Sequence, residues 1–137
     1  MSHSDINIKE RINMAEQAAV PQPRRILSAS TITGDKVVNL QNEDLGKIEE
    51  LMIDLGSGRI AYAVLSFGGF LGLGDKLFAI PWNALSVDQR QKELVLNVDR
   101  DVLQRASGFD KDRWPDMSDP AWGAGIYSHY GYKPYWE

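Results

Sequence analysis

Cysteine is absent from this sequence, histidine occurs only twice, and no apolar run approaches the roughly 18 residues that a membrane-spanning helix requires. Without cysteine there is no disulfide bond, no thiolate nucleophile and no thiolate metal site. His3 stands near the N-terminus and His129 lies in an aromatic C-terminal stretch, so neither a histidine metal cluster nor a serine–histidine–acid relay can readily be assembled. The sequence therefore predicts no catalytic residue, no metal site, no cofactor and no membrane span.

Positive charge is also in short supply, because 15 Lys and Arg stand against 19 Asp and Glu, for a net charge of −4. A nucleic-acid-binding protein normally gathers basic side chains on one face, so this balance offers no electrostatic footprint for a duplex or an anionic membrane. Residues 1–25 lack the basic start, apolar block and small-residue cleavage site of a signal peptide. We therefore expect a cytoplasmic protein whose partner is not a nucleic acid.

The chain has enough apolar sequence for one modest core, since 43% of its 137 residues are hydrophobic. We expect one domain in three parts. In the first part, residues 1–25, Ile6, Ile8 and Ile12 are loosely spaced like one face of a helix before Pro21, which predicts a frayed helix plus linker. An amphipathic hook for a membrane or a partner is the alternative for this part. The other two parts are residues 26–108 and 109–137.

Residues 26–98 have the pattern of several short strands. In the sequence GKIEELMIDL, Ile48 lies on the opposite parity from Leu51 and from the two apolar residues that alternate after it. A single apolar face therefore requires one extra residue near Glu49 and Glu50, which is a β-bulge. The next run, RIAYAVLSF, is apolar on both parities and predicts a strand buried on both faces.

Glycines and polar residues separate these strands. The sequence GSGR at 56–59 predicts a tight hairpin in which two glycines supply positive φ angles. A further strand, KLFAIPW, is stopped by Pro81, and ELVLNV at 93–98 places alternate apolar residues on one face after a polar turn. Short strands joined by glycine turns are typical of a small barrel or sandwich.

The stretch FGGFLGLGDKLFAIPW, residues 67–82, looks more like a catalytic motif than any other part of the chain. A phosphate-binding turn needs backbone N–H groups at the start of a helix, whereas a strand follows here, and Lys76 has no Ser or Thr behind it. We interpret the stretch as a long hairpin connection. Phe70, Leu71 and Leu73 at its tip are expected either to fold back over an open end of the barrel or to contact another chain.

The chain becomes rich in aromatic residues after the strands. A capping Asp99 and a terminal Gly108 mark the two ends of a short predicted helix. Asp119 followed by Pro120 predicts the start of a second helix, of roughly ten residues, that ends before Gly131. So many large rings seldom belong to a disordered tail, so we expect an extension wrapped over the barrel or an arm lying across a second copy. The rings are those of Trp114, Trp122, Tyr127, Tyr130, Tyr132, Tyr135 and Trp136.

Acidic side chains cluster in DKDRWPDMSD, residues 110–119. Counted from Asp110 as an EF-hand loop, the sixth position holds Pro115 instead of glycine and the twelfth holds Ala121 instead of glutamate, so that motif fails. Capping and turn roles are expected for these aspartates, with an irregular oxygen-ligand site as the alternative. Five acidic against three basic side chains in residues 109–137 argue against stacking on nucleic-acid bases.

The run LGKIEELMIDLGSGRIAYAVLSFGGFLGLGDKLFAIPWNAL, with Gly46 and Ile48, a D-x-x-x-G-R-I turn that begins at Asp54, and IPW at 80–82, resembles the PRC-barrel. This small β-barrel is shared by the cytoplasmic domain of the photosynthetic reaction centre H subunit and the C-terminal half of a bacterial ribosome maturation factor. The resemblance covers about residues 26–100, and the tail is similar to the ending of stand-alone bacterial PRC-barrel proteins. It implies an all-β fold, a small PRC-type β-barrel with short N-terminal and C-terminal helical extensions.

The resemblance also implies a module that docks onto other proteins and has no catalytic residues. Neither the membrane helix of the reaction-centre subunit nor the N-terminal domain of the ribosomal factor is found in this sequence, so neither of those jobs is expected. We expect a non-enzymatic interaction or scaffolding module that forms a homodimer or larger assembly and has a protein partner. A small-molecule or cofactor sensor with a cavity at the barrel mouth is the alternative. The residues expected to bind a partner are Phe70, Leu71, Trp82, Trp114, Trp122, Tyr132 and Trp136.

Overall fold

One six-stranded sheet forms the body of the protein, as seen in a computed structural model that describes residues 25–68 and 76–137. The strands lie in the order β4-β3-β2-β1-β6-β5. Neighbouring strands pair antiparallel, except β1 and β6, which pair parallel. The strands are β1 (Lys36–Val38), β2 (Asp44–Asp54), β3 (Arg59–Phe67), β4 (Lys76–Pro81), β5 (Leu85–Asp88) and β6 (Glu93–Leu96).

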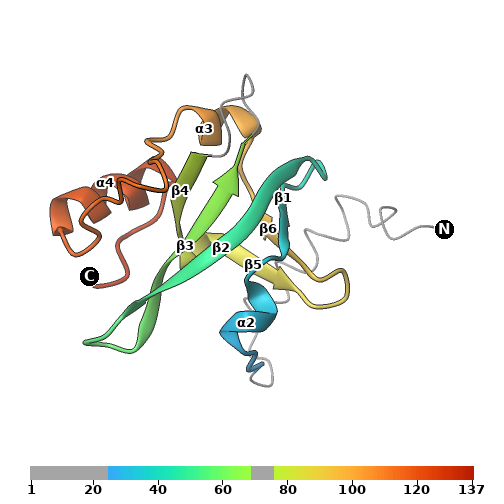
Figure 1. Cartoon of the computed structure of the whole chain (residues 1–137), viewed down its shortest axis with the longest axis horizontal. Helices are drawn as coiled ribbons and strands as arrows, with labels where there is room; N and C mark the ends of the chain where they lie inside the picture. The colour runs from blue at the N-terminus through green and yellow to red at the C-terminus, as the bar shows by residue number, and fades with distance from the viewer. Residues whose placement is uncertain (1–24, 69–75) are drawn as a thin grey trace.

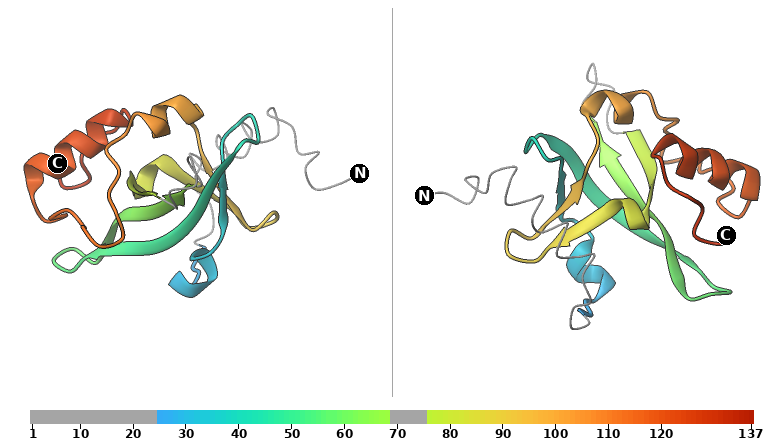
Figure 2. Two further views of the ribbon diagram at one scale, coloured as in Figure 1. Left: turned by 45° about the horizontal axis from the view of Figure 1, so that its top comes forward. Right: turned by 180° about the vertical axis from the view of Figure 1, so that it is seen from behind.

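The sheet curls because its two edge strands follow one another in the chain. Only η3 (Trp82–Ala84), a short 3-10 turn, separates the end of β4 from the start of β5. Three residues span at most about 10 Å, so the two edges of the sheet are drawn together at this end. Figures 1 and 2 show the resulting half-barrel, with the C-terminal helix beside β4. The all-β barrel implied by the resemblance is confirmed.

The β-bulge predicted in β2 is confirmed at Glu49. Ile48 pairs with Leu65 and Glu50 pairs with Val64, which leaves Glu49 as the extra residue. Ile48 is consequently buried in the core, whereas Glu49 and Glu50 are both exposed. The bulge thus lets Ile48 and Leu51 lie on the same face of the sheet despite the break in alternation.

Gly46 allows β2 to pass very close to β3. Its φ angle is +115°, and a Cβ atom placed on it would lie 2.0 Å from the carbonyl oxygen of Ser66. No side chain fits in that space, so the crossing requires glycine. The Gly46 and Ile48 pair was quoted for the resemblance, and this close approach explains on steric grounds why its first residue is glycine.

The tight hairpin predicted at 56–59 is confirmed between β2 and β3. The prediction that both of its glycines take positive φ angles is wrong, because only Gly58 of the two does so, at +74°. Asp54 organises the rest of the turn: its Oδ1 accepts hydrogen bonds from the N–H groups of Gly56 (2.9 Å) and Ser57 (3.3 Å). The Asp54 side chain thus stabilises the turn without a positive φ angle at Gly56.

β3 is buried on both faces, as its two apolar parities predicted, and residues 61–67 are all buried. Cross-strand partners share a face of the sheet, and Val64 is buried although its partner Glu50 is exposed. Tyr62 lies on the same outer face as Val64 and contacts rings of α4 (Pro120–His129). The C-terminal helix therefore covers this part of the outer face.

The remaining strands agree only in part with the sequence pattern. β4 ends at Pro81 as predicted, and β6 buries Leu94 and Leu96 on one face. β1 and β5, of three and four residues, are too short to be recognised from alternation. Within the segment predicted to hold only strands, the structure also has a short helix, α2 (Ala29–Ile32), which the Ser28 side chain caps.

The two C-terminal helices begin where the sequence predicted. α4 starts with the Oδ1 atom of Asp119 accepting a hydrogen bond from the Ala121 N–H at 3.0 Å, and with proline in its first turn. α3 (Arg100–Gln104) follows Asp99 as predicted, but the predicted capping role of Asp99 is wrong, because its side chain makes no capping hydrogen bond.

The prediction that Gly108 ends α3 is wrong. The helix stops at Gln104, and Gly108 lies instead against the Phe78 ring, where a Cβ atom would be 2.8 Å from the ring carbon Cε1. This glycine therefore serves the packing of the chain against β4.

Two predicted features lie outside the described residues. They are the N-terminal helix, apart from Arg25, and the tip of the glycine-rich connection with Phe70, Leu71 and Leu73.

Candidate functional site

Five aromatic rings, which we call the aromatic cluster, join the C-terminal segment to β3. The Tyr62 ring on β3 meets Trp122 and Tyr127 of α4 at centroid distances of 5.3 and 5.6 Å. Tyr127 in turn contacts Tyr135 at 6.0 Å and Trp136 at 5.8 Å. Edge-to-face and tilted pairs of this kind add to the stability that burial itself provides. The aromatic cluster thus holds the chain end against the barrel.

Burial favours the neutral form of the Tyr62 and Tyr127 hydroxyl groups in this cluster. The Tyr127 hydroxyl donates to the carbonyl oxygen of Ala61 at 2.7 Å, and burial, with Tyr62 and Tyr135 adding to it, raises the pKa of Tyr127. Burial also raises the pKa of Tyr62 to about 12, and its hydroxyl has no hydrogen-bond partner in the part of the chain that the structure describes. A Cβ atom on Gly123 would lie 2.5 Å from that hydroxyl, so α4 can approach β3 only with glycine there.

Two hydrogen bonds tie the C-terminal segment to the β2–β3 hairpin. The Tyr135 hydroxyl donates to Oδ2 of Asp54 at 2.5 Å, and Nη1 of Arg59 donates to the Tyr135 carbonyl oxygen at 3.0 Å. The Tyr135 hydroxyl, followed by the Gly56 N–H, lowers the pKa of Asp54 below its ordinary value. Burial, with the hydrogen bond to Asp54, raises the pKa of Tyr135 to about 12. Near neutral pH the pair is therefore a carboxylate and a neutral phenol.

A groove of about 530 Å³, which we call the Arg59 groove, lies where the hairpin, η3 and the C-terminal segment meet. It is lined by Arg59, Ile60, Trp82, Asn83, Tyr127 and Tyr135. Most of its wall consists of rings and an aliphatic side chain, with one guanidinium and one amide among them. The hydroxyl groups of both tyrosines already donate hydrogen bonds, that of Tyr127 to Ala61 and that of Tyr135 to Asp54.

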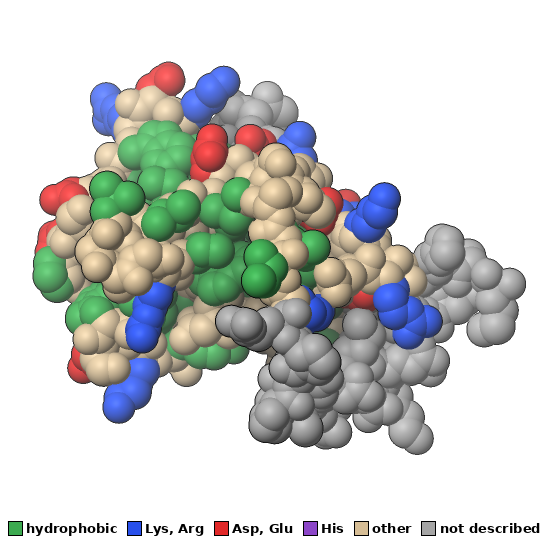
Figure 3. All heavy atoms as spheres, turned by 90° about the horizontal axis from the view of Figure 1, so that it is seen from below, with side chains coloured by type: hydrophobic (Ala, Val, Ile, Leu, Met, Phe, Trp, Pro, Cys, Tyr) green, Lys and Arg blue, Asp and Glu red, His purple; other side chains and the backbone are tan. Residues whose placement is uncertain are grey.

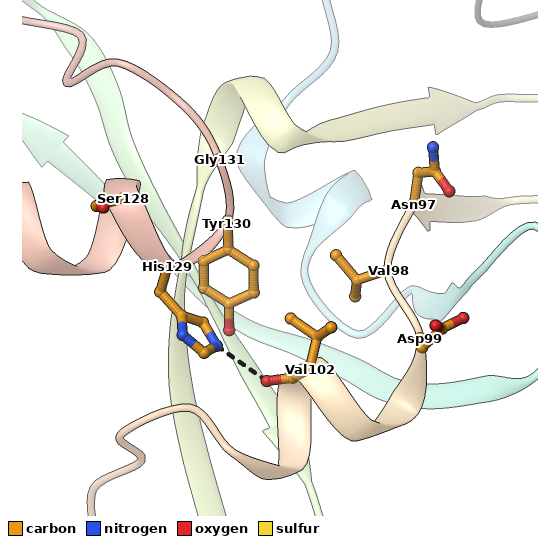
Figure 4. A pocket seen from close by; sticks show the side chains of 8 residues that line it. All are labelled: Asn97, Val98, Asp99, Val102, Ser128, His129, Tyr130 and Gly131. Atoms are coloured by element: carbon orange, nitrogen blue, oxygen red, sulfur yellow. Dashed lines mark hydrogen bonds between the residues drawn. The ribbon is translucent and has the colours of Figure 1, made fainter.

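A second hollow, of about 430 Å³, lies between the end of α4 and the start of α3 (Figure 4). The His129 Nε2 atom lies 2.9 Å from the Val102 carbonyl oxygen, and its imidazole meets the Tyr130 ring edge-on. Figure 4 shows the side chains of Asn97 and Asp99 directed away from His129. The hollow therefore does not bring an acid and a base together around this histidine.

The residues expected to bind a partner are distributed over several parts of the chain. Phe70 and Leu71 lie outside the described residues. Trp82 is half-buried in the wall of the Arg59 groove, and Trp122 and Trp136 belong to the aromatic cluster.

Trp114 and Tyr132 complete that set and lie elsewhere. The Trp114 ring packs against Phe109 in a tilted arrangement at a centroid distance of 5.1 Å, and its indole N–H donates to the Lys111 carbonyl oxygen at 2.9 Å. Tyr132 is 39% exposed and donates its backbone N–H to the Tyr127 carbonyl oxygen, 2.9 Å away. Both therefore have contacts within the chain and still expose part of their rings.

An exposed apolar surface at the hairpin was not among the predicted sites. The apolar face of β2 runs past the barrel, so that Leu51 is half-buried while Ile53 and Leu55 are 56% and 92% exposed. Figures 1 and 2 show this hairpin projecting from the sheet. We call the exposed Ile53 and Leu55 the hairpin surface. The alternation of apolar residues predicts that these side chains share a face of β2, but it does not predict where the barrel ends.

Hydrophobic side chains are also prominent on the lower side of the molecule. Seen from below in Figure 3, they gather over the middle of the face, and acidic and basic side chains lie mainly around its rim. Such a distribution is typical of a surface that another molecule covers.

The acidic segment has local structural roles. Asp116 accepts a hydrogen bond from the Ser118 N–H at 3.0 Å, Asp119 caps α4, and Asp110 forms an ion pair with Lys76 at 3.2 Å. The predicted turn and capping roles are confirmed for Asp116 and Asp119. Within residues 25–68 and 76–137, no three His, Asp or Glu side chains are grouped so that they could hold a metal ion. None of the helices in those ranges has the length and apolar character needed to cross a membrane.

Comparison with known families identifies the barrel. A model of the PRC-barrel domain matches residues 25–103, a range that includes all six strands. The chain belongs to the PRC-barrel family. The PRC-barrel itself supplies one side of the Arg59 groove, through Arg59, Ile60, Trp82 and Asn83. The extension beyond the match supplies the other side, Tyr127 and Tyr135.

Among solved structures, this PRC-barrel protein is similar to a 16S ribosomal RNA processing protein, RimM, from Pseudomonas aeruginosa. The identity is 25% and the TM-score 0.38, over 58% of this chain and 50% of that chain. The match thus spans half the length of the other protein. None of the curated proteins compared with the chain matches it.

Proposed function

We propose that this PRC-barrel protein is a non-enzymatic interaction module that associates with a second copy of itself through the hairpin surface. One observation carries the proposal: Leu55 is 92% exposed at the end of a projecting hairpin. An apolar side chain so exposed gains free energy when a second apolar surface covers it. Membership of the PRC-barrel family supports a docking role, because the family resemblance implied a binding module without catalytic residues.

The hairpin surface is held in place before any partner arrives. Leu55 directly follows Asp54, and the Asp54 side chain accepts a hydrogen bond from the Tyr135 hydroxyl of the C-terminal segment. The Arg59 bond to the Tyr135 carbonyl oxygen restrains the same end of the chain. A surface ordered in this way loses little further conformational entropy on association, which favours binding.

The burial of apolar area determines how strongly the hairpin surface stabilises a dimer. Covering one leucine side chain stabilises a complex by about 1.5–3 kcal/mol. A standard stable interface buries about 800 Å² on each partner, so the hairpin surface would form the centre of the interface and neighbouring residues its rim.

Sedimentation velocity or light scattering of the full chain over a dilution series tests the proposal. We expect the mass to rise from monomer to dimer with concentration. The Leu55→Asp variant should dissociate at least about tenfold more readily, since about 1.4 kcal/mol corresponds to a factor of ten. The dimer of the unchanged protein should also melt at a temperature that increases with concentration.

Ile26→Asp is the matched control for this experiment. Ile26 is 85% exposed, like Leu55, but it follows Arg25, whose guanidinium bonds to the Val87 carbonyl oxygen on β5, an edge strand that pairs with neither strand of the hairpin. Its substitution should leave association unchanged. A full chain that stays monomeric at every concentration contradicts the proposal, as does equal weakening by the two substitutions.

A further inference from the structure

We propose that the Arg59 groove binds a small flat monocarboxylate, an aromatic or unsaturated ring that carries one carboxylate group. The groove volume of about 530 Å³ lies within the range of about 300–1,000 Å³ that is usual for small-molecule sites. The inference does not depend on self-association, because the groove is complete within one chain.

The charge of the ligand follows from Arg59. One of its N–H groups donates to the Tyr135 carbonyl oxygen, and no carboxylate of the described residues lies within ion-pair distance of its guanidinium. A guanidinium has five N–H donors in a planar fork, so most of this fork remains available to a carboxylate, which matches it with two parallel hydrogen bonds. Among the described residues, Arg59 is also the single cationic one that lines the groove, which fits one negative charge better than a phosphate chain.

The other polar groups of the groove favour an acceptor-bearing ligand as well. The Trp82 indole N–H can only donate, and the Asn83 amide is exposed at the groove and can donate through its nitrogen. The tyrosine hydroxyl hydrogens are not available to a ligand, because Tyr127 donates to Ala61 and Tyr135 donates to Asp54.

Asp54 is the charge that opposes an anion here, and its surroundings limit that effect. Its Oδ1 accepts from the N–H groups of Gly56 and Ser57, and its Oδ2 accepts from the Tyr135 hydroxyl. Three donors therefore already face this carboxylate, and Asp54 is not among the lining residues. The ligand carboxylate is expected at Arg59, on the side of the guanidinium away from Asp54.

The flat body of the ligand follows from the rings of the groove. Trp82 comes from η3, whereas Tyr127 and Tyr135 come from the C-terminal segment, and the two tyrosine rings are inclined at 45° to each other. Aromatic faces from two separate segments favour a planar group that stacks on one ring and meets another with its edge. Ile60 adds an aliphatic contact, so a ligand that carries only charge would leave apolar wall uncovered.

A titration of the full chain with 2-naphthoate, followed by NMR, tests the proposal. The Leu55→Asp background is used, so that self-association does not contribute to the signals. We expect saturable shifts of the Trp82 indole N–H and of the backbone amides of Arg59 and Asn83. The comparison ligand is 2-naphthamide, which has the same flat body without the charge, and it should bind at least about tenfold more weakly.

Three variants test separately the charge of Arg59, the geometry of its guanidinium and the aromatic contact of Trp82. Arg59→Gln removes the charge and should weaken 2-naphthoate binding about tenfold or more, whereas Arg59→Lys keeps the charge without the fork and should lie between. Trp82→Leu leaves Arg59 and its bond to Tyr135 intact and should also weaken binding. Arg105→Gln, at an exposed arginine after α3, is the matched control and should bind like the unchanged protein.

Several results would overturn the proposal. They are the absence of saturable shifts, equal binding of 2-naphthamide, unchanged binding by Arg59→Gln, and shifts centred on His129 and Tyr130 in the other hollow. These results would leave self-association untouched, because that is judged by Leu55→Asp and Ile26→Asp in sedimentation.

Discussion

Single glycines decide how closely the elements of this protein approach each other. At Gly46 the neighbour of an added Cβ atom would be the backbone of β3, which cannot move without breaking the ladder. At Gly123 the neighbours would be the side chains of Tyr62 and Trp136, which belong to the aromatic cluster. Gly58 also has a positive φ angle but faces open space. The same residue type therefore carries very different constraints.

The substitution Gly46→Ala is expected to lower the free energy of unfolding by more than about 2 kcal/mol, because it adds a backbone clash to an unfavourable φ angle. Gly58→Ala keeps the unfavourable φ angle without a clash and should lower it by about 1 kcal/mol. Urea unfolding of the two variants followed by circular dichroism measures both values. Equal losses would show that φ alone, and not the approach of β2 to β3, makes Gly46 necessary.

The two C-terminal helices offer a comparison at the scale of the element. Each begins after an aspartate, and only Asp119 of α4 accepts a hydrogen bond from the first turn. Asp99 precedes α3 without such a bond. An aspartate before a helix is therefore a correct sign of where the helix starts, but it does not tell whether the side chain caps it.

Asp119→Ala should lower the free energy of unfolding by about 1 kcal/mol, since a capping hydrogen bond is lost from α4. Asp99→Ala should change it by no more than about 0.5 kcal/mol, because surface substitutions away from such bonds have small effects. Thermal or urea unfolding of both variants measures the difference. If the two losses are the same, the observed cap contributes nothing to stability.

The elements predicted from sequence were those with a complete local signal. The bulge at Glu49, the doubly buried β3 and the start of α4 each depend on fewer than a dozen neighbouring residues. β1 and β5 lack such a signal because so few residues alternate, and their pairing partners are decided elsewhere in the chain. The family resemblance, not the alternation, supplied the barrel itself.

The Arg59 groove shows what local patterns leave out. Trp82 was among the residues expected to bind a partner, but Arg59 was quoted only as part of a turn. The groove joins hairpin, η3 and chain-end residues that are far apart in sequence. Their meeting depends on how the sheet curls and where α4 crosses β3, and no spacing within a segment encodes either. The hairpin surface was missed for the related reason that exposure depends on where the barrel stops.

At the scale of the whole molecule, the C-terminal segment acts as the outer layer of the barrel. It lies beyond the matched family range and covers part of the β3 face that would otherwise be open. Tyr62, only 1% exposed, depends on this cover. The barrel and the extension are therefore expected to unfold together rather than as separate units.

Removal of residues 119–137 should lower the free energy of unfolding by about 3 kcal/mol or more, on the scale of losing a buried aromatic contact. The cut retains Phe109, whose backbone pairs with Leu77 of β4, so the β4 edge keeps that contact. The shortened chain should bind the dye ANS, which reports exposed apolar surface. Urea unfolding and ANS fluorescence measure the two effects, and a shortened chain with the midpoint of the full one would contradict the covering role.

The parallel pair of β1 and β6 governs the order in which the molecule can be assembled. Residues 36–38 meet residues 93–95, whereas β2, β3 and β4 each pair with the strand just before them. During synthesis, β1 to β4 can therefore form a meander before β6 has paired with the other side of β1. Bringing β6 to that side closes a long loop, whose entropy opposes the step. Until the ribosome has released residue 95, the nascent sheet carries an open edge in what will become its middle.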